Sequence, residues 1–231
     1  MELHILSGGA AQGVVRGLEQ AFLEQTGARL QATFGAVGMM KEKLLGGAPC
    51  DVLILTQALI DELEQTGRVE PGSAAPLGRV KTGVAVKAGE AQPDVSTADG
   101  LRAALLAARG IYFPDPQKAT AGIHFINVVK KLGILNEVEA ALRPFPNGAT
   151  AMAQMAAANE PGLLGCTQVT EILYTPGVTL VAPLPVEFEL ATIYTAALST
   201  RADQPELARR LIAALSGDAS KALREQGGFE L

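Results

Sequence analysis

The stretch "ILSGGAAQGVV", residues 5 to 15, decides how the first part of this chain folds. It starts as a short apolar run typical of a buried strand and ends in an apolar pattern with helical spacing. Paired glycines lie between the two, so a strand passes directly into a helix. Unpaired amide groups and the positive end of the helix dipole favour an anion at such a junction. The alternative interpretation is a tight turn that binds nothing.

Composition limits the possible classes of protein. The 231 residues are 48% hydrophobic, which is enough for one large core or two smaller ones. A net charge of -5 and 4% aromatic residues argue against a nucleic-acid partner. Membrane insertion is not expected, since every apolar run falls well short of about 20 residues. Cys50 and Cys166 lack the spacing of a zinc site, and we expect neither a metal nor a cofactor.

Strand-like runs alternate with amphipathic helical stretches along the chain, which predicts an α/β fold with mainly parallel sheets flanked by helices. A segment rich in Pro, Gly and Ser at residues 69–80 precedes a second series of such alternations, so two lobes are expected. Strands are expected at residues 3–6, 29–34, 50–55, 110–113, 162–168, 178–184 and within 186–199. One helix is expected to follow Thr56 as its N-cap, another to begin at Thr120, and a third to follow Asp203 as its N-cap.

The junction of strand, small residues and helix recurs three more times in the sequence. "FGAVGMM" (34–40), "DPQKATAG" (115–122) and "NGATAM" (147–152) each place Gly, Ala or Thr where a helix is expected to begin. If two of the four helix starts come from each lobe, they converge on one anion in a cleft between the lobes. Backbone amides would then hold the ligand in place of fixed cations.

These segments, in the same order over nearly the whole chain, resemble the class II periplasmic substrate-binding proteins of the molybdate-binding type. "GAPCDVLI" (47–54) is similar to a "GAPADV-I" segment of that family, and "DPQKATAG" is similar to the start of its second-lobe anion helix. The resemblance implies a type II binding-protein fold. Lobe one would comprise residues 1–81 and 196–231, lobe two residues 82–195, and two crossing strands would form the hinge.

The resemblance also implies a cellular role. Proteins of this family deliver a solute to the membrane subunits of an ABC transporter, so we expect a periplasmic monomer whose signal peptide has been removed. A cytoplasmic location is the alternative if the gene encodes no leader.

Departures from the family pattern bear on the ligand. Molybdate binders present a serine at each of two first-lobe helix starts and a tyrosine on a second-lobe strand, whereas Gly or Ala, Val or Gly, and Thr stand here. The loss of hydroxyl donors and the added room indicate an organic di- or tricarboxylate in place of molybdate. The ligand residues predicted on this basis are Ser7, Gly8, Gly9, Ala10, Val37, Gly38, Thr120, Ala121, Asn147, Gly148, Thr167 and Gln168.

An enzyme built on the same fold is the second hypothesis. Aconitate isomerases resemble the same family, and their substrate is a tricarboxylate. Interconversion of cis- and trans-aconitate needs a base that removes and returns a carbon-bound proton. His124, Glu171 and Tyr194 are the candidate bases, and no spacing in the sequence selects one of them. For Glu171 the alternative interpretation is an exposed acid at a helix start.

Overall fold

The chain passes twice between two units of structure. The computed structural model describes all residues 1–231, and the division is into unit 1, Met1–Val80 with Thr192–Leu231, and unit 2, Lys81–Ala191. One crossing lies within strand β4 (Ala75–Lys87) and the other at the start of strand β9 (Ala191–Leu198). Unit 2 is therefore one continuous segment, whereas unit 1 is built from both ends of the chain.

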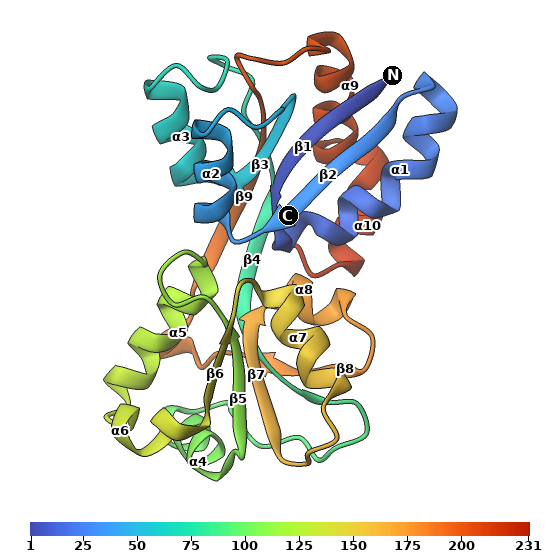
Figure 1. The fold of residues 1–231 in the computed structure, drawn as a ribbon. Helices are drawn as coiled ribbons and strands as arrows, with labels where there is room; N and C mark the ends of the chain where they lie inside the picture. Colours follow the sequence, from blue (N-terminus) through green and yellow to red (C-terminus); the bar gives the residue numbers. More distant parts are fainter. The chain divides into compact units, whose positions relative to one another are not determined.

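Unit 1 contains a sheet covered by helices on both faces (Figure 1). Strand β1 lies parallel to both β2 and β3, and β9 is antiparallel to β3. Helix α1 packs against α9 and α10, while α2 and α3 pack against the strands from the other side. The bounds are β1 (Glu2–Gly8), α1 (Gln12–Thr26), β2 (Arg29–Gly35), α2 (Val37–Leu45), β3 (Val52–Thr56), α3 (Gln57–Gln65), α9 (Pro205–Ser216) and α10 (Lys221–Gln226).

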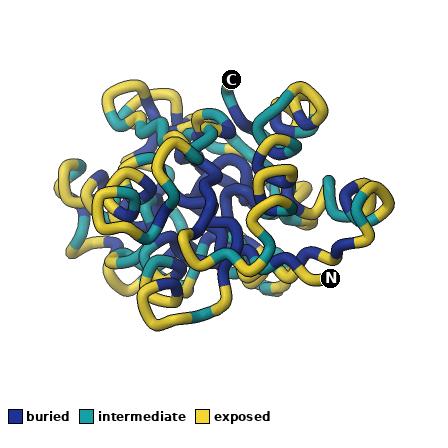
Figure 2. Tube along the Cα trace, turned by 90° about the horizontal axis from the view of Figure 1, so that it is seen from above, coloured by how far each residue is buried: buried dark blue, intermediate teal, exposed yellow.

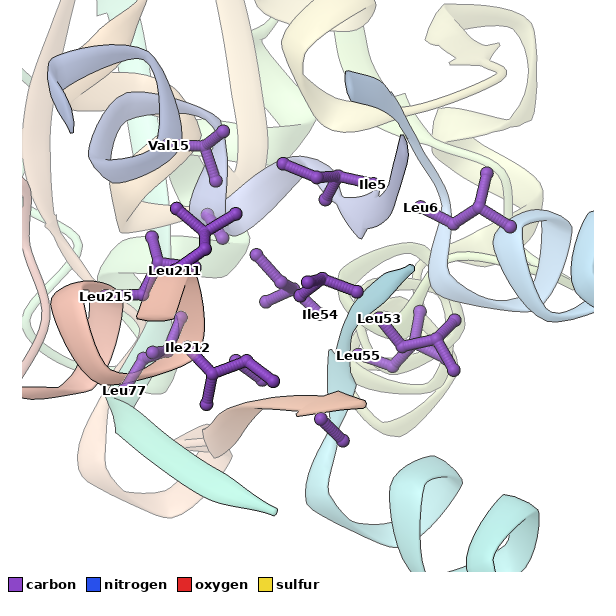
Figure 3. Packing of buried hydrophobic residues seen from close by; sticks show 14 of the residues in the cluster. Ile5, Leu6, Val15, Leu53, Ile54, Leu55, Leu77, Leu211, Ile212 and Leu215 are labelled. Carbon is purple, nitrogen blue, oxygen red and sulfur yellow. The ribbon is translucent and has the colours of Figure 1, made fainter. Parts of the chain in front are cut away.

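Alternation along the strands fills the core of unit 1 on both faces of the sheet. Leu53 and Leu55 lie on one side of β3, and Ile54 between them points the other way, towards Val15 and Leu211 (Figure 3). All three β3 side chains are fully buried, which explains the continuous apolar sequence of this strand. Figure 2 shows the trace coloured by burial, with buried segments inside and exposed residues on the outer turns.

Unit 2 has a parallel core of three strands, with β5 between β6 and β7, and β4 pairs antiparallel with both β7 and β8. Ile111 and Phe113 contribute to the core that includes α4 and α5, whereas Tyr112 contributes to the core that includes α7 and α8. The bounds are α4 (Ala98–Ala107), β5 (Gly110–Pro114), α5 (Thr120–Lys131), α6 (Leu135–Val138), β6 (Leu142–Phe145), α7 (Gly148–Ala157), β7 (Leu163–Gln168), α8 (Val169–Tyr174) and β8 (Val178–Pro183).

The expected α/β class is confirmed, and the differences are local. Asp203 is not the N-cap of α9, because Gln204 occupies that position and Pro205 is the first helical residue. The run at 186–199 is a strand only from Ala191, since a 3-10 turn (η3) occupies Val186–Phe188. Strand β6 was not predicted. Every helix is too short or too polar to span a lipid bilayer.

Arg224 joins three segments of unit 1 through its buried guanidinium group. It donates hydrogen bonds to the carbonyls of Leu77 (2.6 Å), Ser216 (2.9 Å) and Gly217 (2.9 Å), and to the hydroxyl of Ser220 (3.1 Å). Burial lowers the pKa of this guanidinium from its ordinary value. Because the carbonyls belong to β4 and to the end of α9, this side chain fixes the C-terminal helices to the strand that leaves unit 1.

We expect Arg224→Met to lower the free energy of unfolding by about 3 kcal/mol, since the buried carbonyls lose their donor. Urea denaturation followed by circular dichroism measures the loss. Arg209→Met is the matched control, because Arg209 is exposed and pairs only with the exposed Glu70 and Glu206. Equal stability of the two variants would contradict the structural role of Arg224.

Candidate anion-binding site

Two helix starts of unit 1 lie side by side at one edge of its sheet. Gly8 and Gly35 are register partners in the parallel β1 and β2 pair, so the turn beginning at Gly9 and helix α2 beginning at Val37 leave neighbouring strand ends. A Cβ atom on Gly8 would lie 2.8 Å from Val37 Cγ1 and 3.1 Å from Tyr194 Cε1. The missing side chain at Gly8 therefore lets the two helix starts and Tyr194 pack together.

The remaining predicted residues of unit 1 lie at the same two starts. Gly9 and Ala10 belong to the buried 3-10 turn (η1, Gly9–Ala11) that precedes α1, and Gly38 is the second residue of α2. The Ser7 side chain is fully buried, and its hydroxyl donates to the Gly8 carbonyl at 2.8 Å. Ser7 thus uses its proton within the backbone turn and keeps only acceptor capacity for a ligand.

Unit 2 gathers three strand ends at one edge in the same way. Pro114 at the end of β5 is the register partner of Phe145 at the end of β6, and β7 runs parallel beside β5. The helices that follow, α5 from Thr120 and α7 from Gly148, start beyond this edge. In α/β sheets, ligands bind outside the carboxyl ends of the strands.

Several of these helices begin without the caps that other helices of the chain have. The N-cap residues of α1, α2 and α5 are Ala11, Ala36 and Ala119, which have no side-chain hydrogen bond to offer, and no first turn contains an acid. By contrast, α3 and α4 are capped by Thr56 (3.4 Å) and Thr97 (3.1 Å). Amide groups at an uncapped start are left to water or to an anionic ligand.

Helix α7 differs, because groups of the protein itself occupy its start. The Asn147 side chain accepts a hydrogen bond from the Thr150 amide at 2.8 Å, and the Ala149 amide donates to the Glu171 carboxylate. A Cβ atom on Gly148 would overlap both the Glu171 carboxylate and the Thr167 hydroxyl. Glycine is therefore required where this buried carboxylate meets the helix.

Glu171 is the third residue of α8 and is 5% exposed. The Thr167 hydroxyl donates to its carboxylate at 2.5 Å, and the backbone amide of Gln168 donates as well. Burial nevertheless dominates, and it raises the pKa of Glu171 from its ordinary value of 4.5 to about 7. The group can gain or lose a proton near neutral pH.

The other two candidate bases have different surroundings. His124 on α5 holds the Phe188 carbonyl through Nε2 at 2.7 Å, so one ring nitrogen is committed to a structural bond. Tyr194 lies in β9 of unit 1 and is 3% exposed. Glu171 and His124 lie in unit 2, and the Glu171 carboxylate contacts the predicted ligand residues Thr167 and Gly148.

Comparison with known proteins identifies the fold and the family. Residues 3–230 match the family model described as bacterial extracellular solute-binding protein. The chain belongs to this family. Among solved structures, it is similar to the periplasmic molybdate-binding protein of Azotobacter vinelandii (TM-score 0.81, 20% identity, 99% of each chain) and to the sulfate-binding protein SubI of Mycobacterium tuberculosis (TM-score 0.76, 15% identity, 99% of this chain and 86% of that one). The predicted resemblance to the molybdate-binding type is thereby confirmed.

A curated relative adds a different activity to the comparison. An aconitate isomerase of a Pseudomonas species is 27% identical over 232 residues, which cover 97% of this chain and 86% of that protein. One solute-binding fold thus occurs in binders of inorganic anions and in a protein named for turnover of a tricarboxylate.

The sequence did not predict two features of Glu171 in this solute-binding protein, namely its burial and its contact with Gly148. The interpretation of Glu171 as an exposed acid is wrong, because its carboxylate is buried against α7. Glu171 stands three residues after Gln168, which is the last residue of β7 and the N-cap of α8. This is the spacing of a capping box, and it is a local signal that its carboxylate bonds the start of the helix. The contact with Gly148, 23 positions earlier, has no such signal.

No group of three His, Cys, Asp or Glu side chains forms a metal site, and burial raises the pKa of both cysteine thiols.

Glu171→Gln should change how stability depends on pH. Because the pKa of about 7 in the folded protein lies above 4.5, the native state keeps a proton that the unfolded chain loses, and wild type loses stability as pH rises from 4.5 to 7. We expect the variant to gain about 3 kcal/mol relative to wild type across this range. Urea denaturation at pH 4.5 and pH 8 measures it.

Glu137→Gln is the control, because Glu137 is an exposed acid in the first turn of α6. If Glu171→Gln and wild type lose stability in parallel between these two pH values, the Glu171 carboxyl is not the titrating group.

Proposed function

We propose that this chain captures a small organic anion, a di- or tricarboxylate, through amide groups at the helix starts of both units. It acts in the periplasm and hands the ligand to the membrane subunits of an ABC transporter. Family membership supports the solute-binding role. The carboxylate ligand is inferred from the residues of the site.

The uncapped starts of α1, α2 and α5 are the observation that carries this proposal. These helices lack both a capping side chain and a first-turn acid, so no side chain of the helix competes with an anion for the positive potential at its start. An inorganic oxyanion would be favoured by hydroxyl donors at these starts. Apart from Thr120, the residues present are Gly9, Ala10, Val37, Gly38 and Ala121, which offer amides, room and apolar contact but no hydroxyl. Such surroundings suit carboxylates attached to a carbon skeleton.

The named activity of the Pseudomonas relative agrees with this ligand class, because aconitate is a tricarboxylate. Because the net charge of -5 makes the protein as a whole repel anions, local amide groups must provide the attraction for an anionic ligand.

In a thermal-shift panel, di- and tricarboxylates should raise the melting temperature by several degrees, and molybdate and sulfate should raise it less. Saturation at about 100 times Kd corresponds to about 2.7 kcal/mol of stabilisation. A large shift with molybdate and none with any carboxylate would contradict the proposed ligand class.

A pair of variants at α5 tests the site itself. Thr120 is the first residue of α5 and follows Ala119 in an extended conformation, so Thr120→Pro removes one amide donor without breaking the helix. Thr120→Ala removes the hydroxyl but keeps the amide. The proline variant should lose at least about tenfold in carboxylate affinity by titration calorimetry while the alanine variant keeps most of it, because a hydrogen bond to a charged group contributes about 1.5–3 kcal/mol.

A second candidate function, isomerisation of aconitate, is favoured by the Pseudomonas relative and by the surroundings of Glu171. A base takes a proton from the CH₂ carbon, the electron pair delocalises over the allyl system into a carboxylate, and the same acid returns a proton to the other end. Amides at the helix starts would stabilise the developing charge. A pKa near 7 suits a group that must both accept and donate the proton.

Incubation of the protein with cis- and trans-aconitate in D₂O, followed by NMR, separates binding from turnover. A binding protein leaves both isomers unchanged and unlabelled, whereas an isomerase brings both to the same ratio with deuterium at carbon. If turnover occurs, replacement of the base among Glu171, His124 and Tyr194 should lower the rate by about 10² to 10⁴. Full activity in all three variants would exclude every candidate.

A further inference from the structure

The start of helix α7 differs from the other helix starts of the site, because the Glu171 carboxylate of the protein itself lies against it. Its first turn gives the Ala149 amide to Glu171 and the Thr150 amide to Asn147. The first turns of α1, α2 and α5 have no side-chain cap and no acid, and the Asp115 carboxylate before α5 is bonded to the Gln117 and Lys118 amides of the preceding turn. A ligand that reaches Gly148 and Thr167 therefore meets a buried carboxylate bonded to the first turn of the helix itself.

We propose that Glu171 is a specificity-determining residue that excludes fully charged inorganic oxyanions from this site. A tetrahedral dianion such as sulfate has acceptors on every side and would face the Glu171 carboxylate with one of them. An organic acid can bind the uncapped starts with its carboxylates and turn a carbon or a hydroxyl donor towards Gly148 and Thr167. This inference rests on the proposed position of the ligand at the helix starts.

The surroundings of Glu171 leave its charge without a cation to compensate it. Helix α8 packs against α7, β7 and β8, and Val169 at its start approaches Gly83 of β4, whose cations Arg79, Lys81 and Lys87 are bonded to Glu230, Glu189 and the Ala158 carbonyl. Neither α7 nor β8 contains a titratable residue, and β7 contains only Cys166, whose buried thiol has a raised pKa. On α8 itself the other titratable group is Tyr174, which is 42% exposed. The charge on Glu171 is therefore held by hydrogen bonds alone, and its field acts on whatever binds beside it.

The neighbouring polar groups are also not all used by the protein. The buried hydroxyls of Thr82 and Thr170 have no hydrogen-bond partner. Thr170 precedes Glu171 in α8, and Thr82 is the register partner of Gln168 at the end of β7. Donors and acceptors of this kind suit a ligand that brings both, such as a hydroxy acid, better than one that brings acceptors only.

Proton binding gives the inference a second, independent consequence. A pKa of about 7 means that Glu171 is charged at pH 8 and mostly protonated at pH 6. A protonated carboxyl no longer repels a dianion and can donate a hydrogen bond to it. Sulfate stays a dianion across this range, so any change in its affinity reports on the protein.

The experiment measures sulfate affinity of wild type and Glu171→Gln by titration calorimetry at pH 6 and pH 8. At pH 8 the variant should bind sulfate at least about tenfold more tightly than wild type, because like charges at close range cost this much even in a watery medium. Wild type should gain affinity for sulfate between pH 8 and pH 6, and the variant should show a much smaller gain. The control Glu137→Gln should behave like wild type.

The result at pH 8 decides the inference. If Glu171→Gln binds sulfate no more tightly than wild type, including the case in which neither binds, Glu171 does not determine specificity. Should the variant fold poorly, the pH series on wild type alone decides, and an unchanged sulfate affinity overturns the proposal. Failure of the carboxylate panel with a clear gain of sulfate binding in the variant would remove the proposed ligand and leave this inference intact.

Discussion

The amide groups at the start of a helix need acceptors, and this single requirement organises both units of the protein. At α3 and α4 a threonine at the N-cap provides the acceptor. At α1, α2 and α5, which follow strands at the proposed site, the N-cap is alanine and no side chain caps the helix. Side-chain caps are also absent from α6, α8, α9 and α10, so an uncapped start is informative only together with its position beyond a strand end.

Helix α7 is an intermediate case, since a residue of the next helix supplies its acceptor. The arrangement depends on Gly148, because any larger residue would displace the Glu171 carboxylate. Burial of that carboxylate costs free energy when it is charged, so it contributes nothing to stability that an amide side chain would not contribute. The hydrogen bonds from Thr167, Gln168 and Ala149 partly offset this cost.

The sequence predicts the α/β class, most strands and the position of helix starts, because these depend on local spacing. The helix start at Thr120 and the cap at Thr56 are confirmed. Strand β6 has only four residues, with Arg143 and Pro144 in its middle, and it carries too little apolar pattern to be recognised. At Asp203 the residue type was right for an N-cap, but the turn begins one position later, where the Gln204 amide donates to the buried Asp51.

The residues of the candidate site divide in the same way into those with a local sequence signal and those brought together only by tertiary contacts. Glycine, alanine and threonine at a helix start are visible in sequence, whereas the contact of Glu171 with Gly148 exists only after α7 and α8 have packed together. The commitment of His124 to the Phe188 carbonyl is another tertiary contact, 64 positions apart. Distances of this kind explain why the sequence offered three candidate bases of equal standing.

The double crossing of the chain has a consequence for synthesis. Residues 81–191 leave the ribosome as one uninterrupted segment with its own cores, and they can fold as soon as they emerge. The first 80 residues cannot complete their sheet or cover α1 until β9 and α9 have been made. The N-terminal third of the chain therefore stays incomplete until the end of translation, with the apolar strand β3 lacking its partner β9.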